Sequence, residues 1–410
     1  MAKGRDTKPH IGIFGRRNIG KSSLINAFTG QETAIVSEVA GTTTDPVKKS
    51  IEIAGIGPAV VIDTAGIDDS GELGQKRILR SRDMLKLIDL AILVIAENHF
   101  DEPEKGLIAD FRKNDLPFLV IYNKSDLQPA EKDLLKVIHD RYSVPVIEFS
   151  AKYPVNLEEV IRAVQEAMPE SAYRKKPLVG DLISYGDVVL LITPIDIEAP
   201  EGRMILPQVQ VIRDVLDHDG VVVICKEREV DTYLRKMDPK PALVITDSQV
   251  FPKADAAVPR NIPLTSFSII LARQKGDFEN YIKGTPFISK LKDGDRILVL
   301  ESCSHHVSCD DIGRIKIPRW LSSFTGKKLE FTVVAGLDRI PGEMKEYAMV
   351  IQCGSCMITR KQLISRLKPA IDAGIPVTNY GMAIAYVHGI YNRAIEPFNV
   401  STKDGKVDYL

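Results

Sequence analysis

The sequence predicts an α/β protein made of three consecutive modules. Short apolar runs alternate with amphipathic helical patterns along most of the 410 residues, which is typical of βαβ units and parallel sheets. Two segments, 173–181 and the proline-containing 248–263, interrupt this alternation and are expected to be linkers. Because the chain is too long for one ordinary core, we expect domains at 1–172, 181–255 and 265–410.

The first module is predicted to be a doubly wound α/β domain. Its apolar runs are continuous rather than alternating, which indicates strands buried on both faces of a sheet. These strands are expected at 10–15, 59–66, 90–96, 118–124 and 146–150. A closing helix is expected to begin at the N-cap residue Asn156 and to bury one face. That face consists of Leu157, Val160, Ile161 and Val164.

The second and third modules have the same βαβ style. In the second, we expect strands at 187–193, 220–226 and 242–247, and helices at 207–216 and 228–237. It has no phosphate loop, so a role in assembly is favoured over chemistry, and its Cys225 is expected to be a buried core thiol. In the third, we expect strands at 295–301, 329–336 and 347–352, and a helix at 359–374 that contains Pro369.

The composition limits the classes of partner. The net charge of −1 offers no basic field for nucleic acid, and no apolar run approaches the roughly 20 residues that span a bilayer. The opening segment MAKGRDTKPH lacks an apolar signal core, so we expect a cytoplasmic protein without a membrane or nucleic-acid partner. Five cysteines in a reducing compartment favour metal or thiol chemistry over disulfides.

A phosphate-binding loop is predicted at GRRNIGKS, from Gly15 to Ser22, because this motif follows an expected strand and opens a helix. The backbone N–H groups of the loop and the helix start would face the phosphates of a nucleotide. Lys21 would reach the β- and γ-phosphates, and the Ser22 hydroxyl would bind Mg²⁺. The expected nucleotide-contacting residues here are Gly15, Asn18, Gly20, Lys21, Ser22 and Ser23.

Three further motifs follow in the order expected of a guanine-nucleotide site. DTAG at 63–66 places Asp63 near Mg²⁺ and the Gly66 N–H near the γ-phosphate. NKSD at 123–126 supplies Asp126, which can accept both guanine N–H groups, a pattern that adenine cannot match. Asn123 would contact the opposite base edge, Lys124 would pack along the ring, and Ser150 and Ala151 of SAK would close over the base. We therefore expect GTP as the nucleotide.

The first module resembles the small GTPases, and within them the potassium-activated TrmE/Era-like group of tRNA modification and ribosome assembly. The resemblance rests on Asn18 inside the loop and on AGTTTD at 40–45. It implies K⁺ on Asn18 and a Mg²⁺ ligand at Thr43. Ile67 stands where many signalling GTPases have a water-positioning Gln, so slow intrinsic hydrolysis is expected. Glu72 is a candidate catalytic base, but a solvated loop carboxylate is the favoured interpretation, so no base is assigned.

A soft-metal site is predicted in the third module. Cys303 and Cys353 each follow an expected strand, and parallel strands would bring both to one sheet edge. Cys356 precedes a helix whose N-cap would be Thr359, a position that favours thiolate. Spacing alone leaves three options: a zinc site completed by His305, an iron–sulfur cluster with one exchangeable position, or a disulfide or inert thiols.

The domain order resembles the iron–iron hydrogenase maturation GTPase family, HydF, over the whole chain. The most specific elements are CSHH at 303–306, DDIGRIKIPRW at 310–320 and CGSC at 353–356. The resemblance implies that the third module holds a 4Fe-4S cluster. It further implies a scaffold or carrier for a two-iron precursor, partnered by two radical-SAM maturases and the apo-hydrogenase, and a homodimer formed through the middle domain. The implied cluster ligands are Cys303, Cys353 and Cys356.

One departure concerns the residue before C-x-x-C, where the family usually has His and this chain has Gln352. The fourth iron position is therefore open to His305 or Asp310, while Cys309 is a possible surrogate ligand and His306 a surface residue. The alternative function is a potassium-activated GTPase of tRNA modification or ribosome assembly with a structural zinc site.

Overall fold

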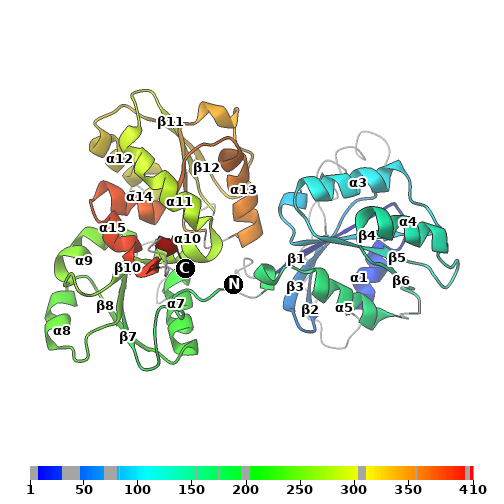
Figure 1. The fold of residues 1–410 in the computed structure, drawn as a ribbon, viewed down its shortest axis with the longest axis horizontal. Coiled ribbons are helices and arrows are strands. Elements are labelled where there is room, and N and C mark those ends of the chain that lie inside the picture. The colour runs from blue at the N-terminus through cyan, green and yellow to red at the C-terminus, as the bar shows by residue number, and fades with distance from the viewer. Residues whose placement is uncertain are drawn as a thin grey trace. The chain divides into compact units, whose positions relative to one another are not determined.

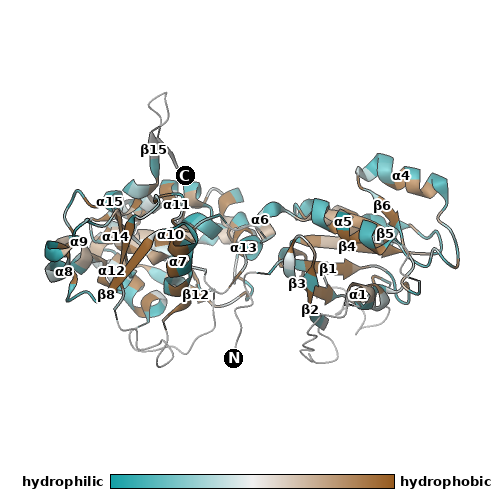
Figure 2. Ribbon diagram, turned by 90° about the horizontal axis from the view of Figure 1, so that it is seen from below, coloured by the Kyte–Doolittle hydropathy of each residue, from teal (hydrophilic) through white to brown (hydrophobic). Residues whose placement is uncertain are grey.

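The computed structural model describes residues 8–29, 47–68, 81–82, 84–153, 156–173, 176–194, 204–302, 311–355, 358–401 and 407–409. The chain divides into two compact units, residues 1–175 and 176–410 (Figure 1). Each is an α/β body in which apolar strands lie between helices with hydrophilic outer sides (Figure 2). Among the described residues, we find no helix with the length and apolar character required to cross a bilayer.

The first unit contains a six-stranded sheet in the order β2-β3-β1-β4-β5-β6. β2 is antiparallel to β3, and the remaining neighbours are parallel. The strands are β1 (His10–Phe14), β2 (Val47–Ile53), β3 (Gly57–Asp63), β4 (Leu90–Ile95), β5 (Phe118–Tyr122) and β6 (Val146–Glu148). Each strand expected in this module is thus confirmed, and β2 is an addition.

Both faces of this sheet are buried, as the continuous apolar runs predict. Along β4, Leu90, Ile92 and Val94 pack with helices α1 and α5, while the alternate residues pack with α3 and α4. The helices are α1 (Lys21–Thr29), α3 (Glu102–Lys113), α4 (Lys132–Tyr142), α5 (Leu157–Ala167) and α6 (Glu170–Tyr173), with a 3₁₀ turn η1 (Met84–Lys86). Asn156 lies at the start of α5 with φ 65°, but its side chain donates to the Glu148 carbonyl rather than capping the helix.

The second unit begins with a four-stranded parallel sheet in the order β10-β9-β7-β8. Its strands are β7 (Val188–Ile192), β8 (Val221–Cys225), β9 (Leu243–Thr246) and β10 (Leu264–Ser266). Its helices are α7 (Leu206–Asp217), α8 (Val230–Lys236), η2 (Ser248–Val250) and α9 (Phe251–Ala257). β8 is an edge strand and Cys225 at its end is only half-buried, which corrects the expectation of a core thiol.

A second parallel sheet follows in the order β12-β11-β13-β14. Its strands are β11 (Arg296–Leu300), β12 (Glu330–Val334), β13 (Met349–Gln352) and β14 (Val377–Asn379). The helices around it are α10 (Phe267–Lys275), α11 (Phe278–Gly284), η3 (Thr285–Lys290), the π-helix η4 (Ile312–Lys316), α12 (Ile317–Thr325), η5 (Met344–Glu346), α13 (Arg360–Asp372), α14 (Tyr380–Val387), α15 (Tyr391–Ile395) and η6 (Glu396–Phe398). β15 (Asn399–Ser401) and β16 (Val407–Tyr409) form a separate antiparallel pair.

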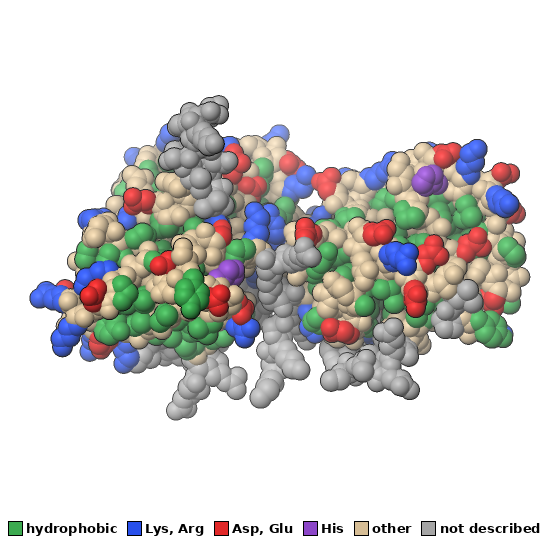
Figure 3. Space-filling model, turned by 60° about the horizontal axis from the view of Figure 1, so that its bottom comes forward, with side chains coloured by type: hydrophobic (Ala, Val, Ile, Leu, Met, Phe, Trp, Pro, Cys, Tyr) green, Lys and Arg blue, Asp and Glu red, His purple; other side chains and the backbone are tan. Residues whose placement is uncertain are grey.

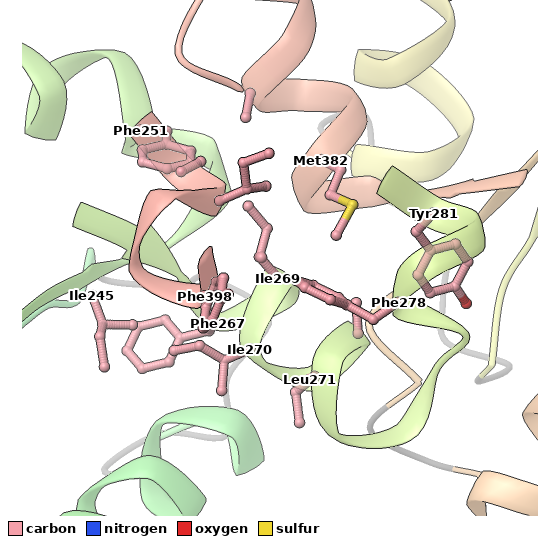
Figure 4. Packing of buried hydrophobic residues seen from close by; sticks show 14 of the residues in the cluster. Ile245, Phe251, Phe267, Ile269, Ile270, Leu271, Phe278, Tyr281, Met382 and Phe398 are labelled. Carbon is pink, nitrogen blue, oxygen red and sulfur yellow. The ribbon is translucent and has the colours of Figure 1, made fainter. Parts of the chain in front are cut away.

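One continuous hydrophobic core joins the two sheets of the second unit. α10 supplies Phe267, Ile269 and Ile270, which pack between Ile245 of the first sheet and Met382 beside the second (Figure 4). The segment 248–263, which its prolines suggested was a linker, instead forms η2, α9 and the approach to β10. Pro252 lies at the first turn of α9, where its missing N–H removes no helical hydrogen bond, so this proline is compatible with a helix.

The other expected linker is also partly folded. The backbone N–H groups of Leu178, Val179 and Gly180 all donate to the Asp214 carboxylate of α7, at 3.0, 2.8 and 2.9 Å. Leu178 and Val179 are buried in the core of the second unit. Three donors on one carboxylate, together with this burial, hold 178–180 against the body that follows.

Candidate functional site

The phosphate loop connects β1 to α1 in the first unit. Gly15 and Gly20 have φ values of 140° and 94°, a region that favours glycine. A Cβ on Gly20 would lie 2.2 Å from Asn123 Nδ2, so the loop packs too closely for any side chain there. The Lys21 ammonium donates to the carbonyls of Gly15 and Arg16 at 3.0 and 2.6 Å, which positions its charge over the loop.

The two expected Mg²⁺ ligands on the described residues lie together. The Ser22 hydroxyl donates to Asp63 Oδ2 at 2.6 Å. Ser22 lies in the first turn of α1 and Asp63 ends β3, so a helix start and a strand end bring these oxygens side by side. Hydroxyl and carboxylate oxygens are ligands that Mg²⁺ prefers.

The DTAG segment lies directly against the phosphate loop. The Ile67 N–H donates to the Gly15 carbonyl at 3.2 Å, and the Thr64 hydroxyl donates to the Ile13 carbonyl at 2.6 Å. A Cβ on Gly66 would meet Arg17 Cγ at 2.4 Å, so glycine is required for this approach. The expected position of the Gly66 N–H near a γ-phosphate is compatible with this packing.

Asn123 connects three motifs of the site. It is 2% exposed, its Nδ2 donates to the Ile19 carbonyl at 2.7 Å, and its Oδ1 accepts the Ala151 N–H at 3.1 Å. These bonds tie NKSD to the phosphate loop and to SAK. The NKSD motif predicts a base-edge contact for Asn123 but not this bracing role, because the partners of Asn123 lie far away in the sequence.

The base-recognition residues form a small polar group at the ends of β5 and β6. The Ser150 hydroxyl donates to Asp126 Oδ1 at 2.7 Å, which orients the carboxylate that would accept the guanine N–H groups. Lys124, with φ 61°, forms an ion pair with Glu97 at 2.9 Å. That pair lowers the pKa of Glu97 through its hydrogen bond and charge, so Glu97 stays ionised beside the site.

Arg16 anchors the phosphate loop to α3. Its Nε lies 2.7 Å from Glu104 Oε1 and its terminal nitrogen 2.8 Å from Asp101, and these bonds raise the pKa of Arg16. Glu104 is buried and also accepts the Asp101 N–H at 2.8 Å, which completes a capping box. The D-x-x-E spacing of Asp101 and Glu104 is the signal in the sequence that indicates this capping box.

Asn18 lies exposed in the loop with φ 57°, a conformation that asparagine tolerates better than most residues. The other half of the expected K⁺ and Mg²⁺ site, Thr43, falls outside the described residues, as does Glu72. The K⁺ assignment therefore stays a prediction.

The thiol site lies at the carboxyl edge of the second sheet in the second unit. β11 and β13 are adjacent and parallel with Leu300 opposite Gln352, which confirms the arrangement expected for the segments before Cys303 and Cys353. The Cys353 thiol is free and half-buried. Thr359 caps α13 by accepting the Gln362 N–H, as expected.

Polar groups from both strand ends surround the Cys353 sulfur. The Ser302 N–H donates to Cys353 Sγ at 3.1 Å, and Gln352 Nε2 lies 3.6 Å from the same sulfur. The Ser302 hydroxyl and the thiol are 3.0 Å apart. Because Ser302 precedes Cys303 directly, this contact links the two predicted ligand positions.

Buried basic side chains secure the loops around this thiol. Arg366 donates to the carbonyls of Glu301 and Val334 at 2.5 and 2.8 Å, and burial lowers its pKa. Lys275 of α10 donates to the carbonyls of Ser355 and Ile358 at 3.0 and 3.2 Å.

Residues 311–314, the described part of the DDIGR segment, are held at the end of β11. Its Arg314 pairs with the buried Glu301 at 2.8 Å, and its Asp311 caps η4 through the Arg314 N–H. A Cβ on Gly313 would lie 2.1 Å from the Tyr380 hydroxyl, so this glycine permits the close approach.

Several predicted ligands fall outside the described residues. These are Cys303, His305, His306, Cys309, Asp310 and Cys356. Among the residues that the structure does describe, no group of three or more His, Cys, Asp or Glu side chains could hold a metal. The ligand set therefore stays a prediction.

Three family models match the chain. The 50S ribosome-binding GTPase model matches residues 10–124, the hydrogen maturase F dimerization domain matches 178–276, and the hydrogen maturase F tetramerization domain matches 279–397. The first unit is thus a GTP-binding P-loop GTPase domain. The second unit contains two domains whose families are named for self-association.

Curated relatives match part of the chain. The tRNA modification GTPase MnmE of Synechococcus sp. is 37% identical over 166 residues, which are 39% of this chain and 35% of that protein. GTPase Der of Helicobacter hepaticus is 35% identical over 173 residues, 40% of this chain and 35% of that protein. The chain therefore spans about a third of the length of these relatives.

The chain is also similar to solved structures. One is Era from Aquifex aeolicus, with a TM-score of 0.35 and 18% identity; the match covers 57% of this chain and 99% of the Era chain. The G domain of the FeoB iron transporter from T. maritima has a TM-score of 0.32 and 20% identity, with coverage of 39% of this chain and 98% of that one.

The two maturase domains follow the GTPase domain directly, and together the three matches account for most of the chain. The chain belongs to the hydrogen maturase F family.

Proposed function

We propose that this protein is a GTP-hydrolysing iron–sulfur scaffold that assembles or delivers the two-iron precursor of iron–iron hydrogenase. The observation that supports it best is the position of Cys353, a free thiol at the carboxyl edge of a parallel sheet, with hydrogen-bond donors at its sulfur. Sites in α/β proteins are built at this edge. Membership of the hydrogen maturase F family supports hydrogenase maturation as the process in which the scaffold acts.

The proposed set of three thiols is chemically suited to a cluster. Cys303, Cys353 and Cys356 would hold a 4Fe-4S cluster, and the buried Gln352 Oε1, which has no hydrogen-bond partner among the described residues, adds a polar atom at the site. Three thiolate ligands leave one iron able to accept an exchangeable ligand, which is the chemistry a carrier of the two-iron cargo needs. His305 and Asp310 remain the proposed alternatives for that fourth position.

The cluster assignment is tested by anaerobic purification of the full chain, with iron, sulfide and zinc analysis and EPR after reduction. We expect about four irons per chain, as the proposed cluster requires, and a loss of iron in Cys353→Ser because that variant removes a thiolate ligand. Stoichiometric zinc without iron would instead support the structural-zinc alternative. Cys225→Ser is the matched control, since this half-exposed thiol lies on β8 in the other sheet, and it should retain the cluster.

The proposed GTPase chemistry uses Lys21, Ser22, Asp63 and Gly66 around Mg²⁺, with K⁺ on Asn18. The Ser22–Asp63 contact of 2.6 Å supports the Mg²⁺ assignment. A cation beside the phosphates would offset the charge that develops in phosphoryl transfer. GTP hydrolysis is measured in matched K⁺ and Na⁺ buffers; equal rates contradict the K⁺ role, and Asn18→Ala should abolish any K⁺ stimulation.

Homodimerisation is proposed through β8, the edge strand of the dimerization domain. Val221 and Ile224 on this strand are 48% and 44% exposed, and apolar side chains gather on the lower face of the second unit (Figure 3). An apolar edge strand with unpaired backbone groups favours strand pairing with another chain. The proposed partners beyond the homodimer are the two radical-SAM maturases and the apo-hydrogenase, with the cytoplasm as location.

A further inference from the structure

Gln352 is the last residue of β13 and is fully buried. Its Nε2 lies 3.0 Å from Ser302 Oγ, 3.2 Å from Ser355 Oγ and 3.6 Å from Cys353 Sγ. A buried amide costs stability unless its polar atoms are paired, and its Oε1 has no partner among the described residues. The site thus keeps a polar side chain where an apolar one would pack at lower cost.

Ser302 contacts both the Gln352 amide and the Cys353 sulfur. Its backbone N–H donates to Cys353 Sγ at 3.1 Å, and the thiol lies 3.0 Å from its hydroxyl oxygen. When Cys353 is a metal-bound thiolate, the thiol proton is gone and the serine hydroxyl can turn to donate to sulfur. The Gln352 amide donates to Ser302 Oγ and so occupies an acceptor position on that oxygen. The Ser302 hydroxyl, which donates to Ser355 Oγ at 3.4 Å, would turn from this long bond to the charged sulfur.

Two fixed features hold this geometry. The Leu300–Gln352 register sets the strand ends, and the Cys353 N–H donates to the Leu300 carbonyl at 2.9 Å. Lys275 donates to the Ser355 and Ile358 carbonyls on the C-terminal side of Cys353. Gln352 therefore belongs to a paired strand, and Ser302 follows the adjacent strand by two residues.

We propose that Gln352 is a positioning residue that raises the reduction potential of the cluster on Cys353, by its own N–H···S bond and through Ser302. This inference rests on the proposed cluster-binding function. Hydrogen bonds to a ligating sulfur withdraw electron density from it, which stabilises the reduced cluster.

The test is a redox titration of the full chain, monitored by EPR after anaerobic reconstitution. Gln352→Met keeps the volume and removes both donors, so the reduced-to-oxidised ratio at a fixed potential should fall about tenfold, which is 59 mV for one electron. Gln352→Glu, which places a carboxylate beside the thiolate, should lower the potential further. Gln208→Met is the matched control: Gln208 is also buried, but it accepts the Ile205 N–H in α7, and its loss should leave the potential unchanged.

Iron content and thermal unfolding show whether each variant is folded and loaded. If Gln352→Met does not hold a cluster, Ser302→Ala serves instead, because it removes the hydroxyl through which Gln352 acts while keeping the backbone donor. A wild-type potential in either loaded variant overturns the inference and leaves the proposed function intact. A wild-type chain that holds no iron–sulfur cluster overturns both.

Discussion

Arg393 joins the two maturase domains of the second unit, and its removal is predicted to destabilise that unit strongly. This α15 side chain is 6% exposed and forms an ion pair with Asp255 of α9 at 2.8 Å. It also donates to the carbonyls of Asp255, Val258, Pro259 and Ile262 at 3.2, 3.0, 2.6 and 3.2 Å. The perturbation is Arg393→Met, which keeps an unbranched apolar stem and removes every donor.

The magnitude follows from what the substitution leaves behind. Asp255, 16% exposed, would lose its buried partner and keep only the exposed Arg260 at 3.1 Å, and four carbonyls would lose a donor. Breaking a buried ion pair from one side costs about 3–5 kcal/mol. For a unit of this size, that corresponds to a fall in melting temperature of roughly 6–20 °C.

The assay is thermal unfolding of the full chain, followed by calorimetry and circular dichroism. The control is Arg213→Met, since Arg213 forms an exposed ion pair with Asp217 and should change the melting temperature little. A fall in melting temperature in Arg393→Met no larger than in this control would refute the stabilising role of Arg393. Separate melting of the two domains in the wild type would refute the shared core as a cooperative unit.

Three further outcomes are expected. Asp126→Asn should weaken GTP binding by roughly 10⁴-fold in calorimetric titration, because an amide cannot accept both guanine N–H groups. Ser150 would still orient the side chain at this position. An unchanged affinity for GTP would contradict the assignment of Asp126 to guanine recognition. Ile224→Lys should convert dimers to monomers in light scattering, whereas Val137→Lys, an exposed apolar residue of α4, should not; a dimer that survives would exclude β8 as the interface. Burial and the nearby Lys48 lower the pKa of His10 to about 4, so the free energy of unfolding should fall by up to about 3 kcal/mol as the pH falls from 6.5 to 4. His10→Gln should remove this pH dependence in urea unfolding. Equal acid sensitivity of the wild type and the variant would contradict the role of His10.

The strands and the nucleotide motifs were predictable because each is encoded by contiguous residues. A buried parallel strand such as β4 needs only a continuous apolar run, and the phosphate loop needs only its fixed spacing. The proline-containing segment 248–263 was misjudged because proline composition does not distinguish a loop from the first turn of a helix, where Pro252 lies. This segment is folded because its apolar residues belong to the hydrophobic core that the two sheets of the second unit share.

By itself, the sequence determined the α/β class, the GTPase motifs, the family resemblance and the edge of the sheet at which the thiols were expected. Only the tertiary structure decided that Asn123 braces three motifs, that Arg393 joins two domains, and that Ser302 and Gln352 direct N–H groups at the Cys353 sulfur. The physical reason is that periodicity and motif spacing are local properties of the chain. Hydrogen-bond partners such as Arg393 and Asp255, which are 138 positions apart, meet only after the chain has folded.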